Sequence, residues 1–154
     1  MKNIALFQKM MSQYHKMSYT SDYILGFVWK HNVYFCICTE ETVNLVTCLD
    51  KASRGAGFAI RFKPNTAQKE YLLTKGAVLL CSEKYFNENV ELSKYNKGEL
   101  FEKLMTEYFG QEWKKDNIPF TEAGDLSVNG IAYQIKYEKA TFANEKSLNR
   151  LSMR

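Results

Sequence analysis

The chain has 154 residues, of which 45% are hydrophobic and 14% aromatic. This length suits one domain, and the composition excludes a disordered or collagen-like chain because it can bury a real core. No apolar run approaches the roughly 18 residues that span a bilayer, and the first residues lack the features of a secretory signal. We therefore expect a cytoplasmic protein with no part in the membrane.

The net charge of +4 is placed unevenly along the chain. Residues 1–90 contain 11 Lys and Arg against 7 Asp and Glu, so the whole excess (11 − 7 = 4) lies there. Residues 91–154 contain 10 of each kind. An excess of this size is compatible with binding nucleic acid but does not require it.

Alternating apolar patterns, interrupted by glycine and proline, predict a mixture of helices and strands in the first ninety residues. The polar stretch that follows, residues 83–96, is expected to be a connection. The expected elements in chain order are a helix over 2–17, two strands over 23–40 with a turn near His31 and Asn32, a short helix over 40–52, a strand over 57–62, a short helix over 66–76 and a buried strand over 77–82.

All four cysteines lie in apolar, strand-like sequence. Zinc sites require paired Cys-x-x-Cys or Cys/His spacings, and these are absent. We therefore expect buried free thiols in a reducing compartment. The cysteines are Cys36, Cys38, Cys48 and Cys81.

A strongly amphipathic helix is predicted over residues 96–113. Asn96 can cap its first turn, with Glu99 as the reciprocal capping partner. At about 100° per residue, Glu99 points away from the apolar stripe, whereas Glu102 lies on its rim and can face a cleft beside the core. The stripe consists of Leu100, Phe101, Leu104, Met105, Tyr108 and Phe109.

Asn129-Gly130 is the favoured pair for a two-residue type I′ turn, so residues 124–137 predict a β-hairpin. In that register, residues whose numbers sum to 259 stand opposite each other, and Asp125 faces Gln134. Side chains alternate between the two faces of a hairpin. One face is then apolar, and the other carries Asp125, Gln134, Lys136 and Glu138.

These polar residues suit the hydrolysis of a phosphodiester bond, which needs a hard cation and an activated water. Asp125 can bind Mg²⁺ or Mn²⁺, and the Gln134 carbonyl oxygen is a weaker ligand. Lys136 can hold the water or stabilise charge in the transition state. Glu102 would supply a second carboxylate, with Glu122 or Glu138 as alternatives. The plain alternative is an ordinary hairpin with one polar face in water.

The pattern of Asp125 followed by Gln134-Ile135-Lys136 on the next strand resembles the PD-(D/E)xK nuclease superfamily. It is most similar to the subset with Gln-x-Lys in place of Glu-x-Lys, as in Mrr-like restriction endonucleases. The resemblance covers about residues 96–151, a little over a third of the chain.

Members of that subset also carry a preceding helix with a Gly-x-x-Phe-Glu pattern, which Gly98, Phe101 and Glu102 match. The resemblance implies a restriction-endonuclease-like core, a mixed sheet flanked by helices, and metal-dependent cleavage of nucleic acid. The family core continues after the lysine strand with a helix and a further strand. Residues 143–151 could supply the helix, and a strand from the first ninety residues would have to take the remaining place.

We therefore expect one compact α/β (α+β) unit, in which residues 1–90 complete or extend the sheet and residues 91–154 form the nuclease-like core. The residues expected to contact nucleic acid are Lys139, Asn144, Lys146 and Arg150, with Thr141 and Asn149 beside them. A second basic group, in which phosphate contact is an alternative to a structural turn, consists of Lys51, Arg54, Arg61 and Lys63 near Gly55 and Gly57.

The leading functional hypothesis is a DNA endonuclease that is structure-selective or weakly sequence-specific, because a chain of this size has little room for base reading. The rival class is a non-catalytic module that binds DNA or another protein on the same scaffold. An exposed sheet edge would also allow a homodimer. A small-molecule enzyme has no support from any loop or cysteine arrangement in the sequence.

Overall fold

The computed structural model describes residues 22–51, 57–113 and 126–144. Strands and helices alternate irregularly within these ranges, so the fold class is α+β with mixed pairing, as the sequence predicts. None of the described helices is long and apolar enough to cross a membrane. The helix expected over residues 2–17 lies outside the described residues.

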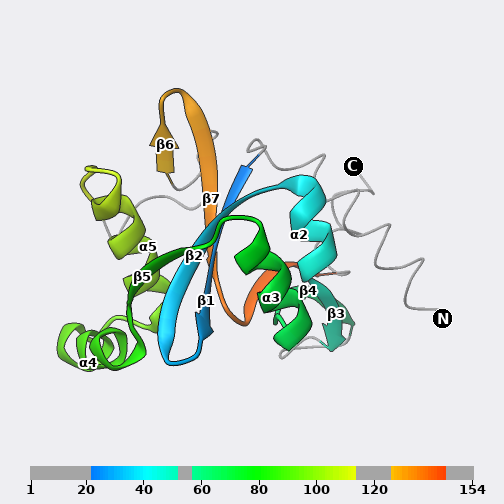
Figure 1. Cartoon of the computed structure of the whole chain (residues 1–154), viewed down its shortest axis with the longest axis horizontal. Coiled ribbons are helices and arrows are strands. Elements are labelled where there is room, and N and C mark those ends of the chain that lie inside the picture. The colour runs from blue at the N-terminus through cyan, green and yellow to red at the C-terminus, as the bar shows by residue number, and fades with distance from the viewer. Residues whose placement is uncertain (1–21, 52–56, 114–125, 145–154) are drawn as a thin grey trace.

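The larger sheet has five strands and runs through the middle of the molecule (Figure 1). In their order across the sheet, they are β5 (Val78–Ser82), β2 (Asn32–Thr39), β1 (Asp22–Trp29), β7 (Ile131–Tyr137) and β6 (Leu126–Val128). β1 pairs antiparallel with β2 and parallel with β7. A strand from the first ninety residues thus lies beside the strand that carries Lys136.

A smaller sheet contains β3 (Cys48–Lys51), β4 (Phe58–Phe62) and β8 (Ala140–Asn144), with β4 in the middle. β4 pairs antiparallel with both neighbours. Each sheet therefore combines strands from before and after residue 91. The N-terminal portion extends both sheets, and the two portions do not form separate sheets.

Four helices are described: α2 (Glu40–Val46), α3 (Thr66–Thr74), α4 (Glu83–Ser93) and α5 (Lys97–Tyr108). In Figure 1, α4 and α5 lie on one side of the larger sheet, and α2 and α3 lie on the other. The α3 helix starts with a reciprocal capping box, in which the Asn65 side chain accepts from Gln68 N and the Gln68 side chain accepts from Asn65 N.

The cap expected at Asn96 is confirmed. Asn96 Oδ1 accepts from Glu99 N at 2.8 Å, and Glu99 Oε1 accepts from Asn96 N at 3.3 Å. An Asn96→Ala substitution should lower the free energy of unfolding by about 1 kcal/mol, because it leaves one N–H of the first turn without its acceptor. Urea denaturation checks this value, and Asn96→Asp, which keeps the acceptor, should stay near wild type. An equal loss in both variants would contradict the cap as the cause.

Two apolar clusters fill the space on either side of the larger sheet. The α3-side cluster includes Tyr23 and Leu25 of β1, together with Leu72 of α3 and Phe142 of β8. The α5-side cluster consists of Ile24, Val33, Phe35, Phe86, Leu100, Phe101, Met105, Leu126, Ile135 and Tyr137. Alternate residues of β1 thus pack in opposite clusters. Because both faces of this strand are buried, its sequence is a continuous apolar run.

Two expectations about secondary structure were wrong. The helix expected over residues 40–52 ends at Val46, because Thr47 is extended and the chain continues as β3, which pairs with β4. The polar stretch expected to be a connection forms α4. Ser82 caps that helix by accepting from Tyr85 N at 3.1 Å, and Phe86 is wholly buried. Phe86 thus packs α4 on the larger sheet, and Val90 packs against the same cluster.

Two further differences concern the ends of the sheets. The strand at residues 78–82 exists but is not buried: Val78 is 42% exposed and Leu79 is 54% exposed, because β5 is an edge strand. The helix expected from residue 143 onwards does not begin there, since residues 140–144 are β8. This strand pairs with β4, about eighty residues earlier in the chain, so no local pattern could indicate it.

The four cysteines carry free thiols, as expected. Cys36 and Cys38 are buried, whereas Cys48 and Cys81 are only partly buried. Burial raises the pKa of the Cys48 and Cys81 thiols above the ordinary value. These two thiols therefore stay protonated near neutral pH and are poor nucleophiles.

Candidate functional site

The hairpin expected around residues 129 and 130 is confirmed. Asn129 and Gly130 have φ angles of 52° and 80°, as a type I′ turn requires. Leu126 lies opposite Tyr133 and Val128 lies opposite Ile131, so the paired residue numbers sum to 259 as predicted. The last described pair of the hairpin is Leu126–Tyr133.

The apolar face of the hairpin is also confirmed. Ile135 and Tyr137 are buried in the α5-side cluster, and the Tyr137 ring stacks on Phe86 at 5.2 Å. Burial is the main reason that the pKa of the Tyr137 hydroxyl is raised above its usual range. The phenol is therefore neutral and serves packing.

Gln134 and Lys136 alternate with these apolar residues and project from the opposite face of β7. Lys136 Nζ lies 5.5 Å from the ring centroid of Phe142 and donates to the Thr141 carbonyl oxygen at 3.2 Å. Phe142 belongs to the α3-side cluster. The ammonium of Lys136 thus lies at the border of that cluster, held by β8 and accessible to solvent.

The helix that carries Glu102 covers the other face of β7. Its buried residues, including Phe101 and Met105, pack in the α5-side cluster together with Ile135 and Tyr137. Glu102 is half-buried on this helix, and its backbone carbonyl accepts from Thr106 Oγ1 at 2.7 Å. The helix that carries Glu102 therefore packs on the face of β7 opposite to the face from which Gln134 and Lys136 project.

Several expected site residues lie outside the described residues, among them the first metal ligand of the hypothesis, Asp125. Of the nucleic-acid candidates in the described part, Lys139 is an exposed turn residue with a φ of 71°. Asn144 is the last residue of β8, where its backbone pairs with Ala59. The others outside the described residues are Glu122, Lys146, Asn149 and Arg150.

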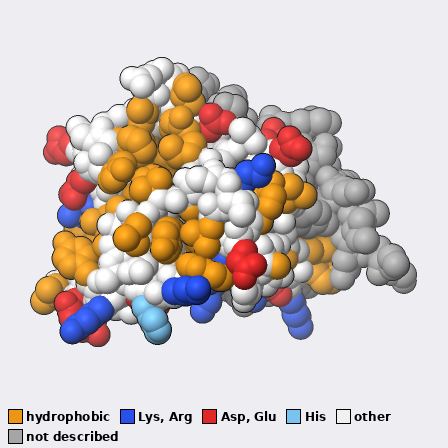
Figure 2. Space-filling view, viewed as in Figure 1, with side chains coloured by type: hydrophobic (Ala, Val, Ile, Leu, Met, Phe, Trp, Pro, Cys, Tyr) orange, Lys and Arg blue, Asp and Glu red, His pale blue; other side chains and the backbone are white. Residues whose placement is uncertain are grey.

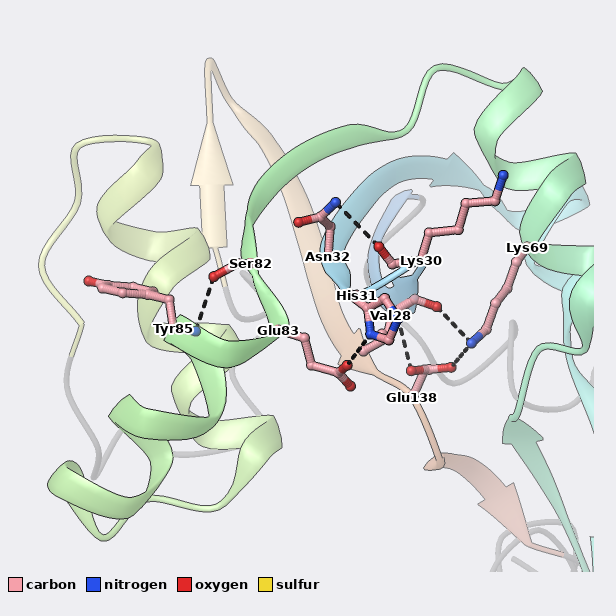
Figure 3. Close-up of polar contacts among 9 residues, drawn as sticks. All are labelled: Val28, Lys30, His31, Asn32, Lys69, Ser82, Glu83, Tyr85 and Glu138. Carbon is pink, nitrogen blue, oxygen red and sulfur yellow. Dashed lines mark hydrogen bonds and ion pairs between the residues drawn. The ribbon is translucent and has the colours of Figure 1, made fainter.

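Glu138, a suggested alternative carboxylate, has a structural role that the sequence did not indicate. Its Oε1 lies 2.7 Å from Lys69 Nζ, and its Oε2 accepts from Val28 N at 3.0 Å. Lys69 Nζ also donates to Val28 O at 2.7 Å (Figure 3). The β1–β7 register ends at Gly26–Tyr137, so the Glu138 carboxylate continues the bonding of β1 beyond the strand pair.

We refer to Val28, Lys69 and Glu138 as the strand-end clamp. The side chains of Lys69 and Glu138 are each only 19% exposed. Lys69 lies on α3, about seventy residues before Glu138, so no spacing rule links the two. The clamp occupies Glu138 fully and leaves it poorly placed to serve as a metal ligand.

The second basic group is partly neutralised. Lys63 Nζ lies 2.9 Å from Asp50 Oδ2, and Arg61 Nε lies 3.9 Å from the same oxygen. The hydrogen bond from Lys63 holds the pKa of the Asp50 carboxyl below its ordinary value. The carboxylate thus remains charged and reduces the positive potential that a phosphate would meet at this place. Arg54 lies outside the described residues.

The described part of the chain contains no group of three or more His, Cys, Asp or Glu side chains placed to hold a metal ion. The metal site of the hypothesis includes Asp125, which lies outside the described residues. No family model, curated protein or solved structure matches the chain. Function must be argued from β7 and its neighbours.

Proposed function

We propose that the chain is a metal-dependent nuclease that hydrolyses phosphodiester bonds in DNA, with its site on the Gln134–Lys136 face of β7. The observation that carries the proposal is the hairpin register, in which residue numbers sum to 259. Continued by one residue beyond Leu126–Tyr133, this register would set Asp125 opposite Gln134. An anionic oxygen, a carboxamide oxygen and an ammonium would then share one face.

Oxygen donors of this kind suit a hard divalent cation such as Mg²⁺ or Mn²⁺. Asp125 and Gln134 would hold the ion, which supplies a Lewis acid for the scissile phosphate. Lys136 would orient the attacking water or stabilise charge on the phosphate. The bond to Thr141 and the ring of Phe142 would keep the ammonium in place for this role.

A second candidate, a non-catalytic DNA-binding module on the same scaffold, is favoured by one observation. The α5 helix that carries Glu102 packs on the other face of β7, and both carboxylate oxygens of Glu138 are bonded within the strand-end clamp. With Gln134 neutral, a site built on Asp125 alone carries one negative charge. Such a site would bind the ion weakly, and phosphate binding through Lys136 would be its main activity.

The two candidates are separated by incubating the purified protein with plasmid, branched and single-stranded DNA in Mg²⁺, Mn²⁺ or a chelator. We expect metal-dependent cleavage that falls roughly a hundredfold in Lys136→Ala, a loss typical of removing one charge-stabilising group. Lys84→Ala, which removes an exposed lysine of α4, should cleave like wild type. Circular dichroism verifies that both variants are folded.

Binding without cleavage, with an affinity that falls steeply as salt rises, would support the module and contradict the nuclease. Melting with increasing Mg²⁺ or Mn²⁺ gives an independent readout, because a ligand that binds only the folded state raises the melting temperature. Asp125→Asn should abolish this increase. An unchanged increase in that variant would remove Asp125 from the ion's ligands.

A further inference from the structure

Two thiols lie next to each other on one face of β2. Cys36 and Cys38 are separated by one residue, so their side chains project from the same side of the strand. Hydrophobic side chains gather at the surface where β2 and β5 lie (Figure 2), and Ile37, between the two cysteines, is 47% exposed. Cys36 and Cys38 instead are buried and belong to the α3-side cluster. We refer to this pair as the β2 dithiol.

The two thiols of this pair interact with each other. Cys38 Sγ also lies 3.5 Å from the carbonyl oxygen of Cys36. A hydrogen bond from the Cys38 thiol lowers the pKa of Cys36 below its ordinary value, and the same bond raises the pKa of Cys38. Cys36 is therefore the thiol that ionises more readily, and a protonated thiol lies beside it. A nucleophilic thiol beside a resolving thiol is typical of a redox-sensitive pair.

The α3 helix covers the β2 dithiol. Cys36 Sγ lies 3.7 Å from the carbonyl oxygen of Leu72 and 3.9 Å from that of Lys75, at the C-terminal end of this helix. Leu72 is the only buried residue of the nine in α3, and Lys69 adds the strand-end clamp. A segment that buries so little opens at a lower free energy than the core strands do. Opening of α3 would expose the dithiol to small molecules.

We propose that the β2 dithiol is a redox site, which hydroperoxides oxidise to a Cys36–Cys38 disulfide when α3 opens. The Cys36 thiolate attacks one peroxide oxygen and becomes a sulfenic acid, while the O–O bond breaks and the other oxygen leaves as water or an alcohol with the proton that Cys36 released. The Cys38 thiol then attacks the Cys36 sulfur, the S–O bond breaks, and the hydroxyl leaves as water with the Cys38 proton. The two sulfurs together lose two electrons, and the peroxide gains them.

The disulfide would strain β2 and would therefore be reversible. The Cα atoms of alternate strand residues lie about 6.6 Å apart, because the rise is about 3.3 Å per residue, whereas those of a disulfide usually lie about 5.5–6 Å apart. The strand must contract at the dithiol. β5 pairs with β2 only over residues 32–35, so in the described structure this half of β2 is paired with β1 alone and is less restrained. Strained disulfides are readily reduced, so a thiol reductant should restore the dithiol.

Treatment of the folded protein with hydrogen peroxide, followed by alkylation and peptide mass spectrometry, tests the site. In wild type, the segment that holds Cys36 and Cys38 should lose the mass of two hydrogen atoms, and dithiothreitol should restore it. Cys38→Ala should stop at a sulfenic acid on Cys36, which dimedone traps. Cys81→Ala is the matched control: Cys81 is partly buried against the α5-side cluster, so this variant should form the disulfide like wild type. Circular dichroism verifies that both variants are folded.

A second measurement tests the route through α3. Glu138→Ala removes the clamp partner of Lys69, so it should raise the oxidation rate about tenfold. Asn96→Ala weakens α5, on the other side of the sheet, and should oxidise at the wild-type rate. A folded wild type that forms no disulfide, or one that forms it through Cys48 or Cys81, would overturn the site. Equal rates in Glu138→Ala and wild type would overturn the route. None of these readouts depends on nuclease activity.

Discussion

A Gly26→Val variant is expected to lose about 3 kcal/mol of its free energy of unfolding, because the site has no room for a side chain. Gly26 lies in the middle of β1, between Phe35 of β2 and Tyr137 of β7. A Cβ atom at this position would lie 2.3 Å from Cζ and 2.4 Å from Cε1 of Phe101. Phe101 is wholly buried, so its ring can shift only by displacing its neighbours in the α5-side cluster. Urea denaturation measures the loss.

The glycine of α5 supplies the matched control. A Cβ at Gly98 meets only Asn96 Oδ1, at 3.4 Å, so Gly98→Ala should be neutral or stabilising by up to about 1 kcal/mol. Replacing Phe101 by a smaller side chain should also relieve the clash. Gly26→Val combined with Phe101→Leu should lower the free energy of unfolding by less than the sum of the two single changes. Strict additivity would contradict a direct contact between Gly26 and Phe101.

At this contact Phe101 of α5 lies directly against β1 at Gly26. A glycine inside an apolar strand pattern often marks the close approach of another element. The sequence predicted the turn and the register of the β6–β7 hairpin and the Asn96 cap, because each depends on residues only a few positions apart. Local chemistry of this kind can be inferred from the sequence alone.

Pairing between distant segments could not be inferred. A helix was expected over residues 143–151, yet residues 140–144 form β8, which pairs with β4 and buries Phe142, a contact that no nearby residue encodes. The same applies to the face of β7 that α5 covers. The apolar stripe of α5 predicted that the helix packs on something, but not that it packs opposite Gln134 and Lys136.

This limit explains the uneven outcome at the candidate site. Alternation along one strand correctly separated the polar Gln134 and Lys136 from the apolar Ile135 and Tyr137. Placing Glu102 in the site requires knowing which face of β7 the α5 helix covers. The periodicity of the sequence does not contain this information. The role of Glu102 as a second carboxylate therefore stays a prediction. The DNA cleavage assay with Lys136→Ala tests directly whether the Gln134–Lys136 face of β7 is catalytic.

The strand-end clamp should contribute substantially to stability. Glu138→Ala would leave Val28 N–H without its acceptor and the Lys69 ammonium without its counter-ion, in a place where both side chains are mostly buried. Removing one partner of a buried pair costs more than the pair itself contributes, because the other charge remains desolvated. We expect the free energy of unfolding to fall by about 2–4 kcal/mol, measured by urea denaturation.

Two variants separate the clamp from a general effect of removing a glutamate. Glu107→Ala breaks the Lys103–Glu107 pair, whose side chains are 35% and 51% exposed, and should cost no more than about 0.5 kcal/mol. Glu138→Gln keeps an oxygen for Val28 N–H but loses the charge, so it should lie between Glu138→Ala and wild type.

The clamp connects α3 to the junction of β1 and β7, the strand pair that combines the two portions of the chain. Its loss should therefore weaken β1–β7 pairing before it affects the β6–β7 hairpin, whose bonds are local. Hydrogen exchange measures this directly. In Glu138→Ala, the amides of Val28 and of residue 138 should exchange faster than in wild type, whereas the amide of Val128 should keep its wild-type protection. Uniform loss of protection at all three amides would mean that Glu138 stabilises the fold as a whole and not this junction.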